Sequence, residues 1–93
     1  MEKLEISERS GRLITFSMKK VPMSIYEVWM SDGNEFKKIA EQTETELIYT
    51  ITSNECKFEF KVRAKKEAQF GFSYGKFSDV LTLETEPATM ENL

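Results

Sequence analysis

Histidine is absent from the 93-residue sequence, and its absence excludes two large groups of reaction mechanism. Ser–His and Cys–His catalysis both need an imidazole base, and zinc sites use histidine as their commonest ligand. The carboxylates alternate with other residues or lie in polar stretches, as on solvated surfaces, and no glycine-rich phosphate-binding pattern leads from a strand into a helix. The sequence therefore predicts a protein that is not an enzyme, with no catalytic residue, no metal site and no cofactor.

Cysteine occurs once, as Cys56, so no disulfide can form within the chain. We interpret Cys56 as a small apolar side chain buried at the start of a strand, because no histidine is present to activate its thiol. An unpaired cysteine fits a reducing compartment, and the sequence has no Asn-x-Ser/Thr glycosylation acceptor. These absences favour an intracellular location.

Long apolar runs and clusters of one charge are also missing. The formal net charge is -3 at pH 7, with acidic and basic residues mixed along the chain. A nucleic-acid partner would need gathered lysines and arginines, and a membrane span would need roughly 20 apolar residues in a row. We therefore expect no nucleic-acid binding and no direct membrane insertion, and the Met-Glu-Lys start lacks the apolar segment of a signal peptide.

The clearest pattern present is a strict alternation between residues 56 and 65. Phe58, Phe60, Val62 and Ala64 occupy every second position, with charged residues between them. A period of two is typical of a β-strand with one buried face, whereas a helix would leave apolar side chains in water on both sides. This segment is expected to be the central strand of the fold.

Similar alternation predicts further strands on both sides of the central one. A short first strand holds Leu4 and Ile6, and Phe16 is the best core candidate of the second. The segment 35–41 has some helical propensity, but its place after the turn formers Ser31-Asp32-Gly33-Asn34 favours a short edge strand. The expected strands after the first are 12–19, 25–30, 35–41, 47–52, 56–65 and 77–85.

The last third of the chain contains less regular features. Residues 66–76 are expected to form a connection that contains three aromatic side chains, and the following strand should carry a bulge or a change of face near Asp79. The segment 87–93 has too few apolar groups to dock and should be a disordered tail. The expected organisation is one domain over residues 1–86 with a tail over 87–93.

Seven short strands separated by turn signals predict an all-β fold, a Greek-key β-sandwich of immunoglobulin-like architecture. The sequence resembles the C, C′, F and G strands of fibronectin type III domains over roughly residues 10–85. It differs in having Phe16 and Met18 where the family usually has a tryptophan, and Phe58 where a tyrosine is usual. The matching patterns are Tyr26-x-Val28, Phe36-x-x-Ile39, Phe58-x-Phe60-x-Val62-x-Ala64 and Gly75-x-Phe77-Ser78-x-Val80.

Two subgroups of that family share short stretches with this chain. Tyr74-Gly75-Lys76-Phe77-Ser78 is similar to the aromatic-serine box of haematopoietic cytokine receptors, which implies aromatic side chains interleaved with Lys61, Arg63 and Lys65. Phe36-Lys37-Lys38-Ile39 and the central strand are similar to the type III domain of nuclear chromatin cofactors that partner a histone lysine methyltransferase. The two resemblances imply different compartments, the outside of a cell and the nucleus.

Two groups of side chains are candidates for binding a partner. Trp29 should point outward beside Lys61 and Arg63, where a basic side-chain stem either covers the indole or helps it form an interface. The aromatic side chains of the predicted 66–76 connection either plug the open end of the sandwich or stay exposed for recognition. The candidate residues are Trp29, Lys61, Arg63, Phe70, Phe72 and Tyr74.

These observations predict a non-catalytic protein–protein interaction module of a larger scaffold or adaptor protein. It would bind another protein or peptide through the sheet formed by strands C, F and G and through the loop before strand G. The alternatives are a structural spacer in a multidomain chain and the membrane-proximal domain of a cytokine-type receptor. The sequence leaves the oligomeric state open, because an exposed edge strand allows pairing between copies.

Overall fold

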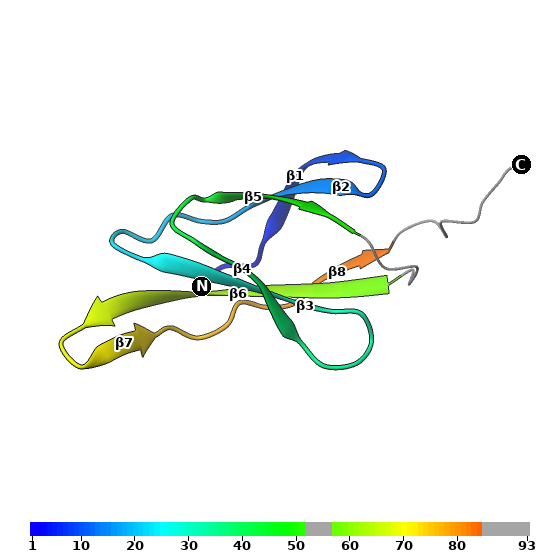
Figure 1. The fold of residues 1–93 in the computed structure, drawn as a ribbon. Helices are drawn as coiled ribbons and strands as arrows, with labels where there is room; N and C mark the ends of the chain where they lie inside the picture. Colours follow the sequence, from blue (N-terminus) through cyan, green and yellow to red (C-terminus); the bar gives the residue numbers. More distant parts are fainter. Residues whose placement is uncertain (52–56, 85–93) are drawn as a thin grey trace, which may run out of the picture.

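The computed structural model describes residues 1–51 and 57–84, and all regular structure in these ranges is β-strand (Figure 1). Three strands form one antiparallel sheet in the order β1-β2-β5, and the others form a second antiparallel sheet in the order β4-β3-β6-β7, with β8 also paired to β6. The first sheet contains β1 (Glu5–Ser10), β2 (Leu13–Ser17) and β5 (Glu46–Thr50). The second contains β3 (Ile25–Ser31), β4 (Lys37–Gln42), β6 (Lys57–Ala68), β7 (Gly71–Tyr74) and β8 (Leu81–Glu84).

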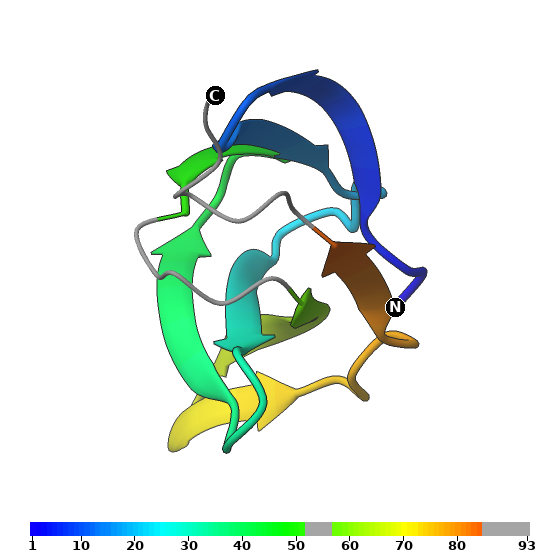
Figure 2. The ribbon, with the colours of Figure 1, turned by 90° about the vertical axis from the view of Figure 1, so that its right-hand side faces the viewer.

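The two sheets face each other (Figure 2), and apolar side chains fill the space between them. Phe58, Phe60 and Val62 point into it from β6 and have no exposed surface, as the alternation predicted. The ring of Phe16, from the opposite sheet, lies 4.6 Å from that of Phe60 between centroids. Each such side chain contributes roughly 2–3 kcal/mol on burial, so the inward row of β6 is a main source of stability. The predicted β-sandwich is confirmed.

Strand β6 is the longest element and organises the second sheet. It pairs with β3 over Glu59–Lys65 on one side. On the other side its first part, Lys57–Phe60, pairs with β8 and its last part, Lys65–Ala68, pairs with β7. The last strand of the second sheet is therefore divided into β7 and β8, which pair with opposite ends of β6.

The prediction of a loop over residues 66–76 is wrong. Strand β6 continues to Ala68 and turns through Gln69 and Phe70 into β7, so most of this stretch forms a hairpin. Gly71 permits the tight turn because it has a φ of 127°, which L side chains rarely adopt. The hairpin projects beyond the rest of the sandwich at the left of Figure 1. The described ranges accordingly contain eight strands where seven were expected for the chain.

The predicted strand 77–85 is regular only from Leu81 onward among the described residues. Seven positions separate Tyr74 from Leu81, whereas five separate their partners Lys65 and Phe60, so two extra residues lie between β7 and β8. This excess confirms the irregularity expected near Asp79.

The strand predicted just after the turn formers Ser31-Asp32-Gly33-Asn34 is confirmed. The segment expected at 35–41 is strand β4 and not a helical turn, and it follows a turn in which Gly33 has a φ of 116°. The Ser31 hydroxyl stabilises that turn by accepting a hydrogen bond from the Gly33 amide at 3.2 Å. Cys56 and the tail over 87–93 lie outside the described residues. No helix within the described ranges is long and apolar enough to cross a membrane.

Candidate functional site

The outer face of the second sheet carries a row of basic side chains from β6. Phe60 and Val62 point into the core, so the alternate residues Lys61, Arg63 and Lys65 must lie on the opposite face. Aromatic side chains from β7 and from the segments before β4 and β8 lie between and beside these cations. We call the resulting row the ladder: in order, Phe36, Lys61, Phe77, Arg63, Tyr74, Lys65 and Phe72.

Cations and rings alternate along the ladder at distances suited to cation–π attraction. The Lys61 Nζ lies 4.2 Å from the Phe36 ring centroid and 4.1 Å from that of Phe77. The Arg63 Cζ lies 4.7 Å from the Phe77 centroid and 4.3 Å from that of Tyr74. Each contact contributes about 0.5–1 kcal/mol at a partly exposed position. The interleaving implied by the aromatic-serine resemblance is therefore present.

The ladder continues onto the β6–β7 hairpin. The Lys65 Nζ lies 5.8 Å from the Tyr74 centroid and 4.4 Å from that of Phe72. Tyr74 lies there because it is paired with Lys65 on the neighbouring strand. Phe72 lies two residues before Tyr74 in the sequence and on the same face of the sheet. The hairpin is thus held to the sheet by side chains as well as by its backbone.

Phe77 reaches the ladder although it lies outside a regular strand. The Gly75 amide donates to the Ala64 carbonyl at 2.8 Å, and the Ser78 amide donates to the Val62 carbonyl at 2.7 Å. A Cβ at position 75 would lie only 3.2 Å from that Ala64 oxygen, so glycine permits the close approach. These two backbone hydrogen bonds bring the ring of Phe77 against Arg63.

Trp29 lies on β3 opposite Lys61, as expected. The Arg63 Cζ is 5.8 Å from its ring centroid, and its ring meets that of Phe77 edge-on at 5.9 Å. The indole N–H donates a hydrogen bond to Glu27 at 3.2 Å. Trp29 is therefore half-buried by its own chain, which supports the interpretation that a basic side chain covers it.

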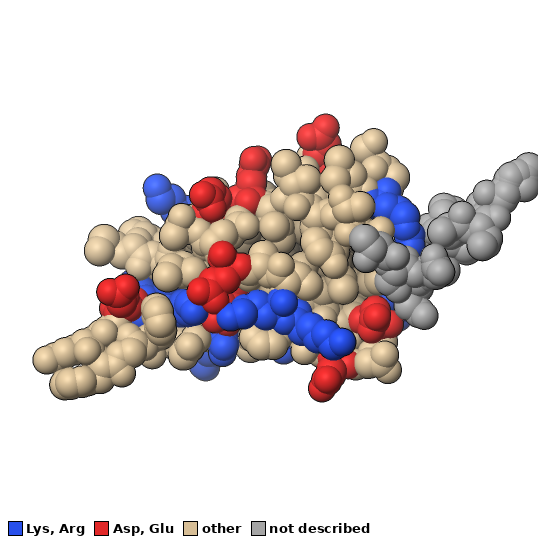
Figure 3. Space-filling model, in the orientation of Figure 1, with Lys and Arg blue, Asp and Glu red and all other residues tan. Residues whose placement is uncertain are grey.

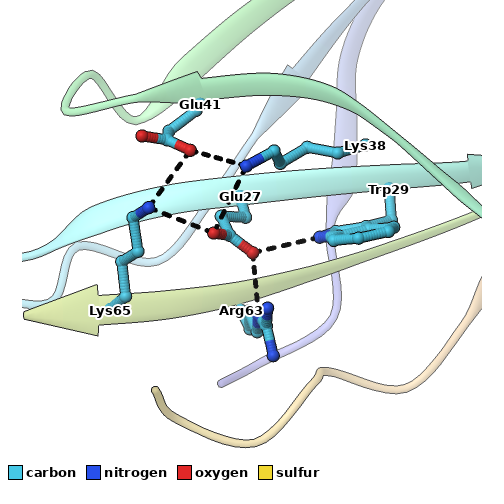
Figure 4. Close-up of polar contacts among 6 residues, drawn as sticks. All are labelled: Glu27, Trp29, Lys38, Glu41, Arg63 and Lys65. Carbon is cyan, nitrogen blue, oxygen red and sulfur yellow. Dashed lines mark hydrogen bonds and ion pairs between the residues drawn. The ribbon is translucent and has the colours of Figure 1, made fainter. Parts of the chain in front are cut away.

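The same face holds a buried carboxylate that the sequence did not single out. Glu27 lies opposite Arg63 in the pairing of β3 with β6, and its side chain is only 2% exposed. Its Oε1 accepts from Arg63 Nε at 2.8 Å and from Trp29, as Figure 4 shows. Its Oε2 lies 3.2 Å from the Lys65 Nζ and 3.6 Å from the Lys38 Nζ. Each of the two carboxylate oxygens thus has two polar or charged partners.

Glu41 completes this group, which we call the carboxylate cluster: Glu27, Trp29, Lys38, Glu41, Arg63 and Lys65. The Glu41 Oε1 lies 2.7 Å from the Lys38 Nζ and 3.1 Å from the Lys65 Nζ. Lys65 therefore bridges two carboxylates beneath the aromatic rings of Tyr74 and Phe72, and only 5% of its surface is exposed. The cluster fastens β3, β4 and β6 together on their outer face (Figure 4).

The charges in the cluster shift one another's pKa. Burial alone raises the pKa of the Glu27 carboxyl, but hydrogen bonds from Arg63, Trp29 and Lys65 outweigh burial and lower the pKa from 4.5 to about 2. Burial lowers the pKa of Lys65, yet its contacts with Glu41 and Glu27 leave that pKa raised overall. Both shifts favour the charged forms, so the ion pair between Glu27 and Lys65 is maintained at neutral pH.

The aromatic side chains of the hairpin are exposed and do not plug the end of the sandwich. Phe70 is 94% exposed at the turn, Tyr74 is 51% exposed and Phe72 is 44% exposed. They follow the hairpin because β7 continues the second sheet outward, away from the core. Figure 3 shows the far end of the hairpin as an uncharged protrusion, with acidic and basic side chains side by side over the middle of the sheet.

The structure thus brings together five of the six predicted site residues in the ladder and its surroundings, and it leaves Phe70 apart at the hairpin turn. Sequence reasoning missed Glu27, Lys38 and Glu41. One signal was available, since Glu27 alternates with Tyr26 and Val28 in a strand that is apolar on both sides. Among the described residues no group of acidic, cysteine or histidine side chains could hold a metal ion.

Comparison with known proteins identifies the class of fold. A fibronectin type III domain of human fibronectin type III domain containing protein 3 superimposes with a TM-score of 0.66 at 15% identity, covering 95% of this chain and 85% of that one. A fibronectin type III domain from the human KIAA0970 protein gives a TM-score of 0.65 at 15% identity, with 98% and 76% of the two chains covered. The chain therefore has the fibronectin type III fold, as the resemblance predicted.

Sequence comparison adds no narrower assignment, since no protein-family model and no curated protein sequence matches.

Proposed function

We propose that this domain is a non-catalytic protein-interaction module that binds a partner protein through the β6–β7 hairpin and the adjoining outer face of the second sheet. One observation carries the proposal: Phe70, Phe72 and Tyr74 present aromatic surface to solvent on a hairpin that side chains hold in place. Aromatic side chains are enriched at the energetic centres of interfaces, and exposed groups of them mark binding surfaces.

The ladder gives the hairpin the rigidity that binding needs. Lys65 and Arg63 fix the rings of Phe72 and Tyr74 from one side, and the carboxylates beneath them fix the two cations in turn. A surface that is already ordered loses little conformational entropy on binding. In this proposal Lys61, Arg63 and Trp29 mainly support the interface, while the hairpin aromatics make direct contact.

The setting of the module is part of the same proposal. The single cysteine and the absence of a glycosylation acceptor support a scaffold or adaptor protein inside the cell. A second candidate is the membrane-proximal domain of a cytokine-type receptor, and the interleaved ladder favours it. An upstream cysteine-bridged domain and a downstream membrane span in the parent gene would support the receptor and count against the adaptor.

Photo-cross-linking tests the interaction. The chain is made with a benzoylphenylalanine in place of Phe70 and, as a matched control, in place of Ile48, which is 66% exposed on the first sheet. The expected result is a protein cross-linked specifically from position 70, with much less from position 48, in an extract of the source cells. If neither position captures a protein above background, the interaction module is excluded and the spacer is favoured.

A further inference from the structure

The ladder ends on an aromatic ring whose outer side has no cation. Phe77 lies between Lys61 and Arg63, and Tyr74 lies between Arg63 and Lys65. Phe72, like Phe36 at the other end of the ladder, contacts only one cation among the described residues, which is Lys65. A ring in this row can therefore contact two cations, one on each side, whereas Phe72 contacts one.

The next position in the row of β6 carries an acid. The outward residues run Lys61, Arg63, Lys65 and then Glu67, which is paired directly with Phe72 across the hairpin. Glu67 is exposed, and it makes no ion pair within the described ranges. A carboxylate therefore stands beside an open aromatic ring at the place where the pattern would continue with a cation.

The surroundings of Glu67 suit a long cationic side chain. Glu67 borders an open hollow that is also lined by Met23 and Ile25, whose apolar surfaces fit the methylene stem of a lysine or arginine. Lys20 borders the same hollow but does not pair with Glu67. The nearly fully exposed ring of Phe70 lies at the adjacent turn. The chain's net charge of -3 also favours the approach of a basic segment.

We propose that the hairpin end binds a lysine or arginine side chain of a partner protein, which stacks on Phe72 and pairs with the Glu67 carboxylate. This inference rests on the proposed function and adds the chemistry of the partner: a basic peptide segment. The incoming cation completes the alternation that the ladder begins, and the exposed ring of Phe70 at the turn offers further apolar surface to the same segment. A partner segment rich in acidic residues would meet Glu67 and be repelled.

A random twelve-residue peptide phage library provides the probe. Peptides are selected on the intact chain and then depleted on a variant with Glu67→Gln, Phe70→Ala and Phe72→Ala. Peptides that survive depletion are expected to share an arginine or lysine. Resynthesis with citrulline, the neutral isostere of arginine, should weaken binding about tenfold, because one cation–π contact and one charge pair are lost.

Single variants separate the contacts. Glu67→Gln and Phe70→Ala should each weaken the selected peptides about three- to fivefold without lowering the melting temperature, since both side chains are exposed. Glu67→Lys places a cation of the chain itself beside Phe72, so it should abolish binding while the domain stays as stable as before. Ile48→Ala, which removes exposed apolar surface from the other sheet, should leave the affinity unchanged.

The outcomes separate this inference from the function on which it rests. Three results would overturn the inference. The peptides that survive depletion could share no lysine or arginine, the arginine and citrulline peptides could bind equally well, or the Glu67→Lys variant could retain binding. A protein cross-linked from position 70 would then still support the interaction module. Absence of both hairpin-dependent peptides and cross-links from position 70 would remove the function and the inference together.

Discussion

Val62 and Ser78 exchange two hydrogen bonds although Ser78 belongs to no regular strand. The Val62 amide donates to the Ser78 Oγ at 3.0 Å, and the Ser78 amide donates to the Val62 carbonyl at 2.7 Å. The serine hydroxyl therefore replaces the backbone carbonyl that a continuous strand would have offered to the centre of β6. This exchange satisfies buried backbone groups in the gap between β7 and β8.

Replacing Ser78 with alanine should lower the free energy of unfolding by about 1–3 kcal/mol, because the buried Val62 amide loses its acceptor. Urea denaturation measures the effect. Ser73→Ala is the matched control, since Ser73 is exposed on β7. An equal loss in the two variants would show that the hydroxyl at position 78 has no special part.

The stability of the domain should fall as the pH drops from about 4.5 to about 2. The pKa of Glu27 is about 2 in the folded protein against an ordinary value of 4.5, so its stabilising contribution is complete above pH 4.5 and is lost as the pH falls through the folded value. The full contribution is about 3 kcal/mol. Unfolding by urea at a series of pH values measures it.

Glu27→Gln should remove the steep part of that pH dependence and cost about 3 kcal/mol at pH 7, since the buried Lys65 and the partly buried Arg63 lose their shared counter-charge. Glu8→Gln is the control, because Glu8 is exposed on β1 and makes no ion pair among residues 1–51 and 57–84. A Glu27→Gln protein that keeps the acid sensitivity of the parent would assign that sensitivity to other carboxylates.

Arg63→Ala should destabilise the domain by about 2 kcal/mol, because Arg63 pairs with Glu27 and lies against the rings of Phe77 and Tyr74. Arg63→Lys should cost about 1 kcal/mol, since an ammonium keeps the charge but stacks less well on rings. Thermal unfolding followed by Trp29 fluorescence reports both. Equal stability of the lysine variant and the parent would mean that charge alone matters at this position.

Tyr26→Phe should cost about 1–2 kcal/mol. The buried Tyr26 hydroxyl accepts from the Val21 amide at 2.7 Å and donates to the Val21 carbonyl at 3.2 Å, which ties the segment before β3 to the core. Tyr74→Phe provides the comparison, because the half-exposed Tyr74 contributes its ring to the ladder. Denaturant titration should show a clear loss for the first variant and almost none for the second.

The sandwich and much of its core could be predicted because they depend on local periodicity. Phe58, Phe60 and Val62 alternate with charged residues, and a strand is the only regular element that buries all three on one face. The row formed by Lys61, Arg63 and Lys65 follows from the same alternation. The ladder could be anticipated to that extent from one strand.

The hairpin and the carboxylate cluster depend on contacts between distant segments. Residues 66–76 lack a strong strand pattern of their own, and they are extended because Tyr74 and Phe72 pack on Lys65 across the pairing with β6. Glu27 is buried because cations from β4 and β6 meet over it. Neither pairing can be found in the sequence without knowing which strands are neighbours and in which register.

The two extra residues between β7 and β8 also bear on how this sheet behaves in a crowded solution. A strand from another molecule that paired with this edge of the sheet could form regular hydrogen bonds only with the four residues of β7 and, after the irregular segment, with the four residues of β8. Edge strands this short are poor templates for the strand pairing that builds a fibril. Closing the gap by deleting two residues should therefore create a longer continuous border and a greater tendency to aggregate.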